Sequence, residues 1–191
     1  LAPLLARVFS AVGGAGAAAP AFLQGAISFF YKTGERSDPA NYRPITLLNA
    51  DYRILARVLA TRVGRLLEPA IDAAQCAFLP GRRMGEVVWL LQLLPYLLRE
   101  HQQEAVLAFL DFAKAYDTVD RDFLYGVMAE MGAGDGLLRW VRALLTNTDA
   151  VAVVNGHASA PVRFAAGVRQ GCPLAPLLYL FVAEALLAWL K

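Results

Sequence analysis

The chain has 191 residues, 58% of them hydrophobic and 18% charged, with a formal net charge of +2. This composition excludes a disordered or acidic solvating chain, and so small a charge gives no support by itself for binding a polyanion. The two cysteines, Cys76 and Cys172, and the two histidines lie far apart and lack the spacing of a zinc site or a disulfide framework. We therefore expect one domain or two small ones, with free thiols.

The first 48 residues predict a short helix followed by a hairpin. Apolar residues predict the helix over residues 4–12, ended by the glycines at positions 13, 14 and 16. The stretches AISFFYK and YRPITLL predict two strands joined by the polar loop TGERSDPAN. Lys32 leaves the first strand and Arg43 begins the second, so the hairpin carries a cation at each inner end. These cations could hold an anion or only solvate the surface.

An amphipathic helix is predicted over residues 49–67, where apolar residues recur at helical spacing. These apolar residues are Ile54, Leu55, Val58, Leu59, Val63 and Leu66. At about 100° per residue, Arg53, Arg57 and Arg65 fall on the opposite side, within an arc of about 120°. That face could meet phosphates, or it could be an ordinary solvated helix face.

The stretch FLDFAKAYDTVD, residues 109–120, places a carboxylate after an apolar run. Five apolar residues lead directly into Asp111, which predicts a buried strand over residues 104–111 with an acid at its end. An isolated buried carboxylate is costly, and Mg²⁺, which favours carboxylate oxygens and serves phosphoryl transfer, is one compensation. Alternatively, Asp111 caps the next helical turn or pairs with Lys114. The aspartates at 117, 120 and 122 are interpreted as a turn residue, a helix cap and a first-turn acid.

The other elements are helices and hairpins. A loop, QCAFLPGRRMGE, is followed by a helix over residues 87–99 that Pro95 should kink or end. Asp120 caps a helix running to about Met131, and GLLRWVRALL predicts another. VAVVNGHASAPVRFAAGV predicts a hairpin with an Asn-Gly turn, and RQGCPLAP predicts a tight turn. Without a βαβ rhythm, this pattern predicts an α+β fold with an antiparallel sheet.

The C-terminal run from Cys172 to Leu190 is almost wholly apolar and long enough to cross a bilayer. Pro173, Pro176 and Glu184 argue against a membrane helix. We therefore expect no membrane partner.

Four stretches, in this order, carry a family resemblance: NYRPITLLNADYRILARVLATR, FLPGR, FLDFAKAYDTVD and GVRQGCPLAPLLY. Together they resemble the reverse transcriptase domain of LINE-type (non-long-terminal-repeat) retroelements, and the resemblance covers nearly the whole chain. It implies a right-hand polymerase, with fingers in residues 1–100 and the first part of the palm in residues 101–191. The implied activity is RNA-directed DNA polymerisation in the nucleus, on an RNA template and a DNA primer, with dNTPs and two Mg²⁺ ions.

The resemblance also implies residue roles in catalysis. Asp111 matches the first metal-binding aspartate of the family, and the backbone carbonyl of Phe112 would assist it. Tyr116 stands where the family places an aromatic ring against the sugar of the incoming nucleotide. A ring there would collide with a 2′-hydroxyl and so favour dNTPs over rNTPs.

Four further residues match family positions around the nucleotide. Lys32 and Arg43 resemble the fingers residues that hold the triphosphate. Gln170 and Gly171 match the turn that contacts the nucleotide sugar and the template base. A side chain larger than hydrogen at Gly171 would crowd that approach.

The family's second catalytic motif, an aromatic-Ala-Asp-Asp turn, does not occur in the sequence and is expected beyond Lys191. We therefore expect a fragment that needs the remainder of the palm and thumb, is inactive alone, and exposes the apolar helix from Leu177. The alternative is a decayed retroelement remnant that binds RNA without catalysis.

Overall fold

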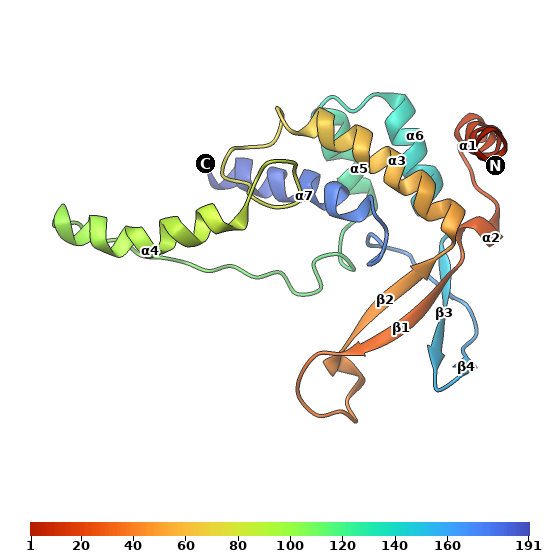
Figure 1. Ribbon diagram of the computed structural model, residues 1–191, viewed down its shortest axis with the longest axis horizontal. Coiled ribbons are helices and arrows are strands. Elements are labelled where there is room, and N and C mark those ends of the chain that lie inside the picture. Colours follow the sequence, from red (N-terminus) through yellow and green to blue (C-terminus); the bar gives the residue numbers. More distant parts are fainter.

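A five-stranded sheet made of two hairpins forms one side of the molecule, which we describe from a computed structural model of residues 1–191 (Figure 1). β1 (Gly25–Tyr31) and β2 (Tyr42–Leu48) make the first hairpin. β3 (Asp149–Val154) pairs with β4 (His157–Ala158) and β5 (Val162–Arg163), giving the order β2-β1-β3-β4 with β5 beside β3. The predicted α+β class is confirmed, because the strands are mostly antiparallel. The parallel pairing of β1 with β3 was not predicted.

Both predicted hairpins are present. The turn between β3 and β4 consists of Asn155 and Gly156, whose φ angles are 50° and 80°. Two successive positive φ angles are what a two-residue hairpin turn requires, so the Asn-Gly prediction is confirmed. The first hairpin has a longer connection, which includes the 3₁₀ helix η1 (Pro39–Asn41), capped by the side chain of Asp38.

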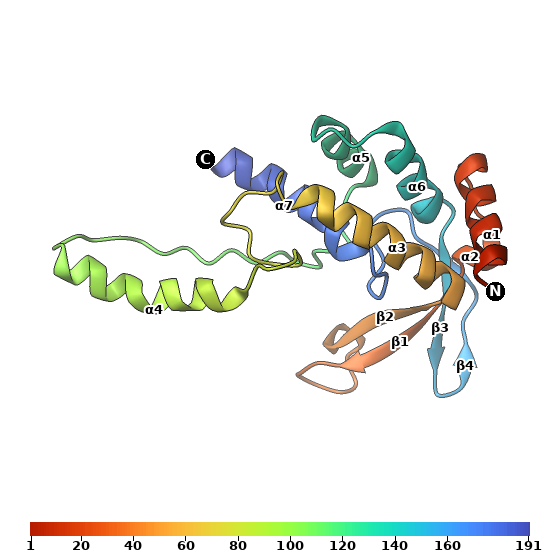
Figure 2. The ribbon, with the colours of Figure 1, turned by 45° about the horizontal axis from the view of Figure 1, so that its top comes forward.

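The helices gather at one end of the sheet around a single hydrophobic core (Figure 2). They include α3 (Ala50–Leu67), α5 (Arg121–Glu130), α6 (Asp135–Leu145) and α7 (Ala175–Leu190), and α7 packs against both α3 and α5. The core contains 27 buried residues drawn from both sides of residue 100. The two halves of the chain therefore share one core.

The N-terminal helix is longer than predicted. α1 (Ala2–Ala15) continues through two glycines and ends only at Gly16, whose φ of 65° suits a helix C-cap. A Cβ added to Gly13 would lie 2.3 Å from the Trp140 ring of α6. The glycine thus serves close packing of two helices rather than termination. A short helix, α2 (Pro20–Leu23), connects α1 to the sheet.

The predicted helix over residues 49–67 is confirmed as α3, but its buried face is rotated about the helix axis from the predicted one. Of the six apolar residues assigned to the core, Leu55, Leu59 and Val63 are buried, and the other three, Ile54, Val58 and Leu66, are exposed. The stripe is completed by smaller or polar-tipped residues, Tyr52, Ala56 and Ala60. Side-chain hydrophobicity alone misplaced the buried face, because small residues can face the core while large apolar residues on the next sector stay exposed.

The strand predicted over residues 104–111 is wrong, whereas the helix predicted over residues 87–99 is confirmed. That helix, α4 (Met84–Glu100), continues through Pro95 and projects away from the other helices in both views (Figures 1 and 2). Residues 104–111 return along it without forming a strand, and Val106 and Phe109 are 97% and 80% exposed. A strand needs a hydrogen-bonded neighbour, and none of the five strands pairs with this segment. Asp111 therefore does not end a buried strand.

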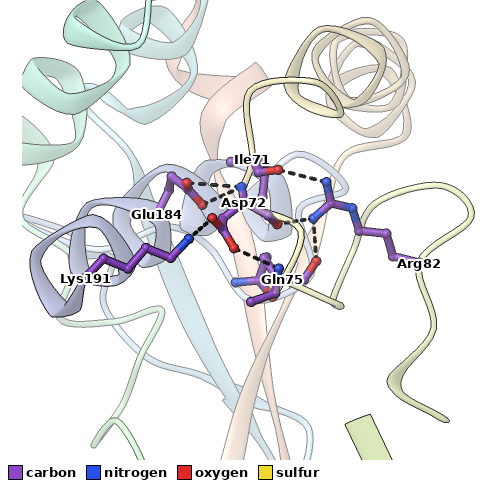
Figure 3. A network of polar contacts seen from close by, with 7 residues as sticks. Ile71, Asp72, Gln75, Arg82, Glu184 and Lys191 are labelled. Carbon is purple, nitrogen blue, oxygen red and sulfur yellow. Dashed lines mark hydrogen bonds and ion pairs between the residues drawn. The ribbon is translucent and has the colours of Figure 1, made fainter. Parts of the chain in front are cut away.

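A polar network ties the loop after α3 to the end of α7 (Figure 3). The guanidinium of Arg82 donates to four backbone carbonyls, those of Glu68, Ile71, Asp72 and Gln75. The Glu184 carboxylate accepts the Asp72 backbone N–H at 3.1 and 3.2 Å, and Lys191 forms an ion pair with the Asp72 side chain. Arg82 belongs to the FLPGR stretch, and here it organises the loop.

The apolar C-terminal helix is confirmed as α7, but the expectation that it is uncovered holds only for its end. Leu177, Leu178 and Phe181 are buried against the neighbouring helices, whereas Trp189 is 80% exposed. No helix of this chain combines the length and the hydropathy needed to cross a bilayer.

Candidate nucleotide-binding site

A cleft of about 560 Å³ lies where β2, the turn at residues 115–116 and the start of α7 meet. Four residues predicted to bind a nucleotide line it: Arg43, Tyr116, Gln170 and Gly171. Three different parts of the chain, more than a hundred positions apart at their extremes, contribute to one surface. Lys32 and Asp111, by contrast, do not line this cleft.

The first hairpin places its two cations on the same face. Arg43 lies opposite Phe30 in the β1–β2 register, and directly opposed residues share a face of the sheet. The backbone N–H of Lys32 donates to the Asn41 carbonyl at 2.8 Å, which continues the ladder beyond β1. By the two-residue alternation of strands, Lys32 projects to the Arg43 side. Both side chains are exposed and neither forms an ion pair.

Asp111 is exposed and has no side-chain hydrogen bond or ion pair. Neither alternative for it, a cap or a pairing with Lys114, is present. The next residue, Phe112, presents its ring edge to Tyr179 of α7, at a centroid distance of 6.2 Å and an interplanar angle of 85°. The carboxylate is thus free to interact with a ligand.

Tyr179 also holds the ring of Tyr116, with centroids 5.3 Å apart. Burial, followed by the neighbouring Tyr179, raises the pKa of the Tyr116 phenol. Burial and then the Asp111 charge raise the pKa of Tyr179. Sequence reasoning gave Tyr179 no role, although it is the last residue of the stretch GVRQGCPLAPLLY.

Backbone hydrogen bonds fix the turn that carries Tyr116. Its carbonyl accepts the Val168 N–H at 2.8 Å, and the Val119 carbonyl accepts the Gly167 N–H at 2.8 Å. The Gln170 side-chain amide donates to both carboxylate oxygens of Asp117 at 3.1 Å. Asp117, predicted to be a hydrogen-bonding turn residue, thus holds the Gln170 side chain in place.

Gly171 is required by the protein itself. Its φ is 108°, and an added Cβ would lie 2.3 Å from the carbonyl oxygen of Thr46 in β2. The preceding carbonyl, that of Gln170, accepts the Thr46 N–H at 2.9 Å. The turn therefore packs against the edge of β2 and is hydrogen-bonded to it. A side chain at Gly171 would collide with that strand, whether or not a nucleotide is bound.

Arg121, which sequence reasoning also missed, supports the site from behind. A guanidinium has five N–H donors. Those of Arg121 reach the carbonyls of Leu145, Phe164, Ala166 and Gly167 and the hydroxyl of Thr148, at 2.7 to 3.4 Å. Burial lowers the pKa of Arg121. The side chain joins three segments that lead into the site, and its position next to the Asp120 cap gave no signal of this role.

The three arginines predicted on α3 are exposed, as expected for a phosphate-binding or solvated face. Arg53 and Arg57 line a shallow cleft of about 480 Å³ with Ile54, Val58 and Pro173. Arg65 lies outside this cleft, two turns further along the helix.

The residues of this chain do not form a complete metal site. No three His, Cys, Asp or Glu side chains are grouped so that they could hold a metal ion. Asp111 can offer one carboxylate, and the carbonyl of Phe112 is adjacent to it in the chain.

Comparison with known proteins agrees with this arrangement. Residues 31–191 match the family described as reverse transcriptase (RNA-dependent DNA polymerase). The chain belongs to the reverse transcriptase family. It is 30% identical to the transposon TX1 uncharacterized 149 kDa protein of Xenopus laevis over 86% of its own length, and 31% identical to the R2 retrotransposable element Pol polyprotein of Popillia japonica over 84%. It is also 31% identical to the RNA-directed DNA polymerase from mobile element jockey of Drosophila melanogaster over 92% of its length.

These retrotransposon relatives confirm the prediction of a LINE-type reverse transcriptase domain. The domain spans only 13%, 22% and 19% of the TX1, R2 and jockey proteins, respectively. Polymerases of this kind use divalent metal ions, and the family implies binding of a nucleic-acid template and primer.

Proposed function

We propose that this reverse transcriptase domain supplies the nucleotide-binding and template-binding part of an RNA-directed DNA polymerase. The observation that carries the proposal is the cleft in which Arg43, Tyr116, Gln170 and Gly171 meet. Its substrates would be a dNTP, an RNA template and a DNA primer. Residues 1–100 would act as fingers and residues 101–191 as the first part of the palm, even though both halves share one core.

In this proposal the triphosphate lies against the hairpin face that carries both cations. Arg43 can grip phosphate oxygens bidentately, and Lys32 adds a compact charge on the same face. The Tyr116 ring, held by Tyr179, would lie against the sugar and exclude a 2′-hydroxyl. Gln170, fixed by Asp117, would contact the sugar and the template base from the side of the turn.

Asp111 and the carbonyl of Phe112 are proposed ligands of one of two Mg²⁺ ions, which would polarise the phosphoryl oxygens during transfer. Because this chain contributes a single free carboxylate there, we expect residues 1–191 to bind nucleotides but not to extend a primer. The remainder of the palm and the thumb would be needed for catalysis.

Nucleic acid is proposed to contact the exposed face of α3. Arg53, Arg57 and Arg65 would bind backbone phosphates, which makes affinity strongly dependent on salt. Each arginine removed should lower the slope of log affinity against log salt by about 0.7 to 0.9. We also propose nuclear action, from the family resemblance alone. Exclusion of the tagged full-length protein from the nucleus would contradict it.

The first test measures binding of a fluorescent dATP analogue to residues 1–191 by anisotropy. We expect Arg43→Ala to weaken binding about tenfold or more, because a charge-assisted contact to phosphate contributes roughly 1.5–3 kcal/mol. Arg99→Ala, at the exposed end of α4, is the matched control and should have no effect. Equal affinities for the Arg43 variant and the control would refute the nucleotide cleft.

A second measurement tests the aromatic position. Competition by dATP and ATP against the analogue gives the preference for the deoxy sugar, and Tyr116→Ala should remove it while Tyr116→Phe keeps it. The activity itself is tested in the full-length protein by primer extension on an RNA template. There, Asp111→Asn should abolish Mg²⁺-dependent extension without releasing the template, and undiminished extension would exclude Asp111 as a ligand.

A further inference from the structure

Arg169 is buried and has no hydrogen-bond partner. Its side chain and backbone are together only 4% exposed, and none of its three guanidinium nitrogens finds an acceptor. These are the only buried side-chain nitrogen or oxygen atoms of the chain that lack a partner. Arg121 and Arg82, in contrast, donate to five and four protein acceptors, respectively.

The guanidinium of Arg169 lies near two aromatic rings, at 5.7 Å from the Tyr52 centroid and 5.8 Å from the Phe164 centroid. Such contacts favour the charge by about 2 kcal/mol when desolvated, which is less than the several kcal/mol that burying an unpaired ion costs. The rings also accept no conventional hydrogen bond. Five N–H donors are therefore left to be satisfied by something that the chain does not supply.

Arg169 lines a second cavity, on the opposite face of the first hairpin from the nucleotide cleft. This hairpin cavity has a volume of about 210 Å³ and is lined by Ile27, Phe29, Pro44, Thr46, Arg121 and Phe164, besides Arg169 and its neighbours. Alternation along β2 separates the two sites, because Arg43 and Ile45 face the nucleotide cleft whereas Pro44 and Thr46 face the hairpin cavity.

The hairpin cavity carries two positive charges and one negative one, so its net charge is positive. Both arginines line it, and Arg121 is saturated by neutral acceptors that leave its charge uncompensated. The single carboxylate in the lining, that of Asp117, accepts the Gln170 amide and forms no ion pair with either arginine. Burial lowers the pKa of Arg169, and the Arg121 cation acts in the same direction. An anion in the cavity would relieve both effects.

We propose that the hairpin cavity is an anion-binding site in which Arg169 binds a phosphate group. The planar fork of a guanidinium matches phosphate oxygens, and a second nearby cation favours a phosphate over a singly charged carboxylate. The phosphate could be inorganic or part of an RNA backbone, which share this chemistry. Arg169 and Gln170 line both the hairpin cavity and the nucleotide cleft, so the two sites adjoin, whereas Arg43 and Tyr116 line the cleft alone. The site goes beyond the proposed nucleotide-binding function, because its anion is held on the Pro44 and Thr46 side of the hairpin, away from Arg43.

The direct test is an NMR titration of residues 1–191 labelled with ¹⁵N-arginine, in which the arginine Nε–Hε signals are monitored. Arg169→Lys identifies the Arg169 signal by its loss. Sodium phosphate, exchanged for chloride at constant ionic strength, should shift the Arg169 signal saturably while leaving that of exposed Arg99 unmoved. An Arg169 signal that does not respond in the folded chain would overturn the proposal and leave ordered water as the partner.

Thermal unfolding gives an independent test. In chloride, Arg169→Met should unfold at the same temperature as the wild type or higher, because it removes an unpaired buried charge. Phosphate should raise the unfolding temperature of the wild type and of Arg99→Met, but not that of Arg169→Met. An equal phosphate effect in all three proteins would refute the site. If Arg169→Met does not fold, the titration of the wild type decides.

A titration with single-stranded RNA that lacks terminal phosphates distinguishes an RNA backbone phosphate from inorganic phosphate as the ligand. If the RNA shifts the Arg169 signal and competes with phosphate, the site takes a backbone phosphodiester. If inorganic phosphate shifts the signal and the RNA does not, the site takes a free phosphate. Both results support the anion site, and no shift with either ligand refutes it.

Discussion

Replacing Gly171 by alanine tests the contact that positions the turn between the nucleotide cleft and β2. The glycine has a φ of 108°, which alanine adopts only under strain. An alanine Cβ would lie 2.3 Å from the Thr46 carbonyl oxygen, and this oxygen belongs to a strand backbone that cannot rotate away as a side chain could. The turn must therefore move away from β2.

The magnitude follows from two contributions. A non-glycine residue at such a φ costs of the order of 1–3 kcal/mol. Moving the turn also breaks the Thr46 N–H bond to the Gln170 carbonyl, now 2.9 Å long, whose loss costs about 1 kcal/mol. We expect Gly171→Ala to lose about 2–4 kcal/mol of unfolding free energy. At about 2–4 °C per kcal/mol for a chain of this size, the unfolding temperature should fall by roughly 4–16 °C.

The assay is urea unfolding followed by circular dichroism, with Gly126→Ala as the matched control. Gly126 lies inside α5, has no atom within 4 Å of an added Cβ, and has no positive φ. Alanine there should stabilise the chain by about 0.5–1 kcal/mol, because it is the better helix former. Glycine-to-alanine substitution should therefore lower the unfolding free energy at position 171 and raise it at position 126. A Gly171→Ala variant as stable as the wild type would refute the close approach to Thr46.

Three further predictions concern residues outside the cleft. Arg121→Met should lower the unfolding free energy by about 2–4 kcal/mol in urea titrations, since it removes five hydrogen bonds and leaves the carbonyls of Phe164, Ala166 and Gly167 without this donor; a loss below about 0.5 kcal/mol would count against a stabilising role for Arg121. Asp120→Ala should cost about 1 kcal/mol in the same assay, because the carboxylate accepts the Phe123 N–H at 2.7 Å, and an Asn variant should restore most of it. Burial raises the pKa of the Cys172 thiol, so a thiol reagent should modify Cys76 quickly and Cys172 only on unfolding; two equally fast thiols would contradict its burial.

The sequence predicted local structure well because local structure follows from local rules. Alternating and helical periodicities identified both hairpins and α3, α5, α6 and α7. The Asn-Gly pair specified its turn, and Asp120 specified the start of α5, because each depends on the backbone of a few neighbouring residues. The four nucleotide residues were found by motif, and the structure brings them together in one cleft.

The failures concern what a segment packs against. Residues 104–111 have the composition of a buried strand, but burial depends on a neighbour, and in this chain no strand pairs with them. The parallel β1–β3 pair joins strands more than a hundred residues apart, which no local pattern specifies. Likewise, Gly171 was assigned to ligand access, whereas its nearest obstacle is β2, a distant part of the chain.

Arginine shows most clearly why composition does not give a binding surface. The chain has 18 lysines and arginines, but Arg82 and Arg121 use their donors on backbone carbonyls of their own protein, and Arg169 is buried. All three count fully toward the net charge, but Arg82 and Arg121 have their donors occupied within the protein. Exposed cations such as Arg53 and Arg43 remain available for phosphate contacts on the surface, and the affinity for RNA should follow the available cations rather than the net charge. A buried guanidinium without an acceptor is the exception, since it requires an anion or water for the folded state itself.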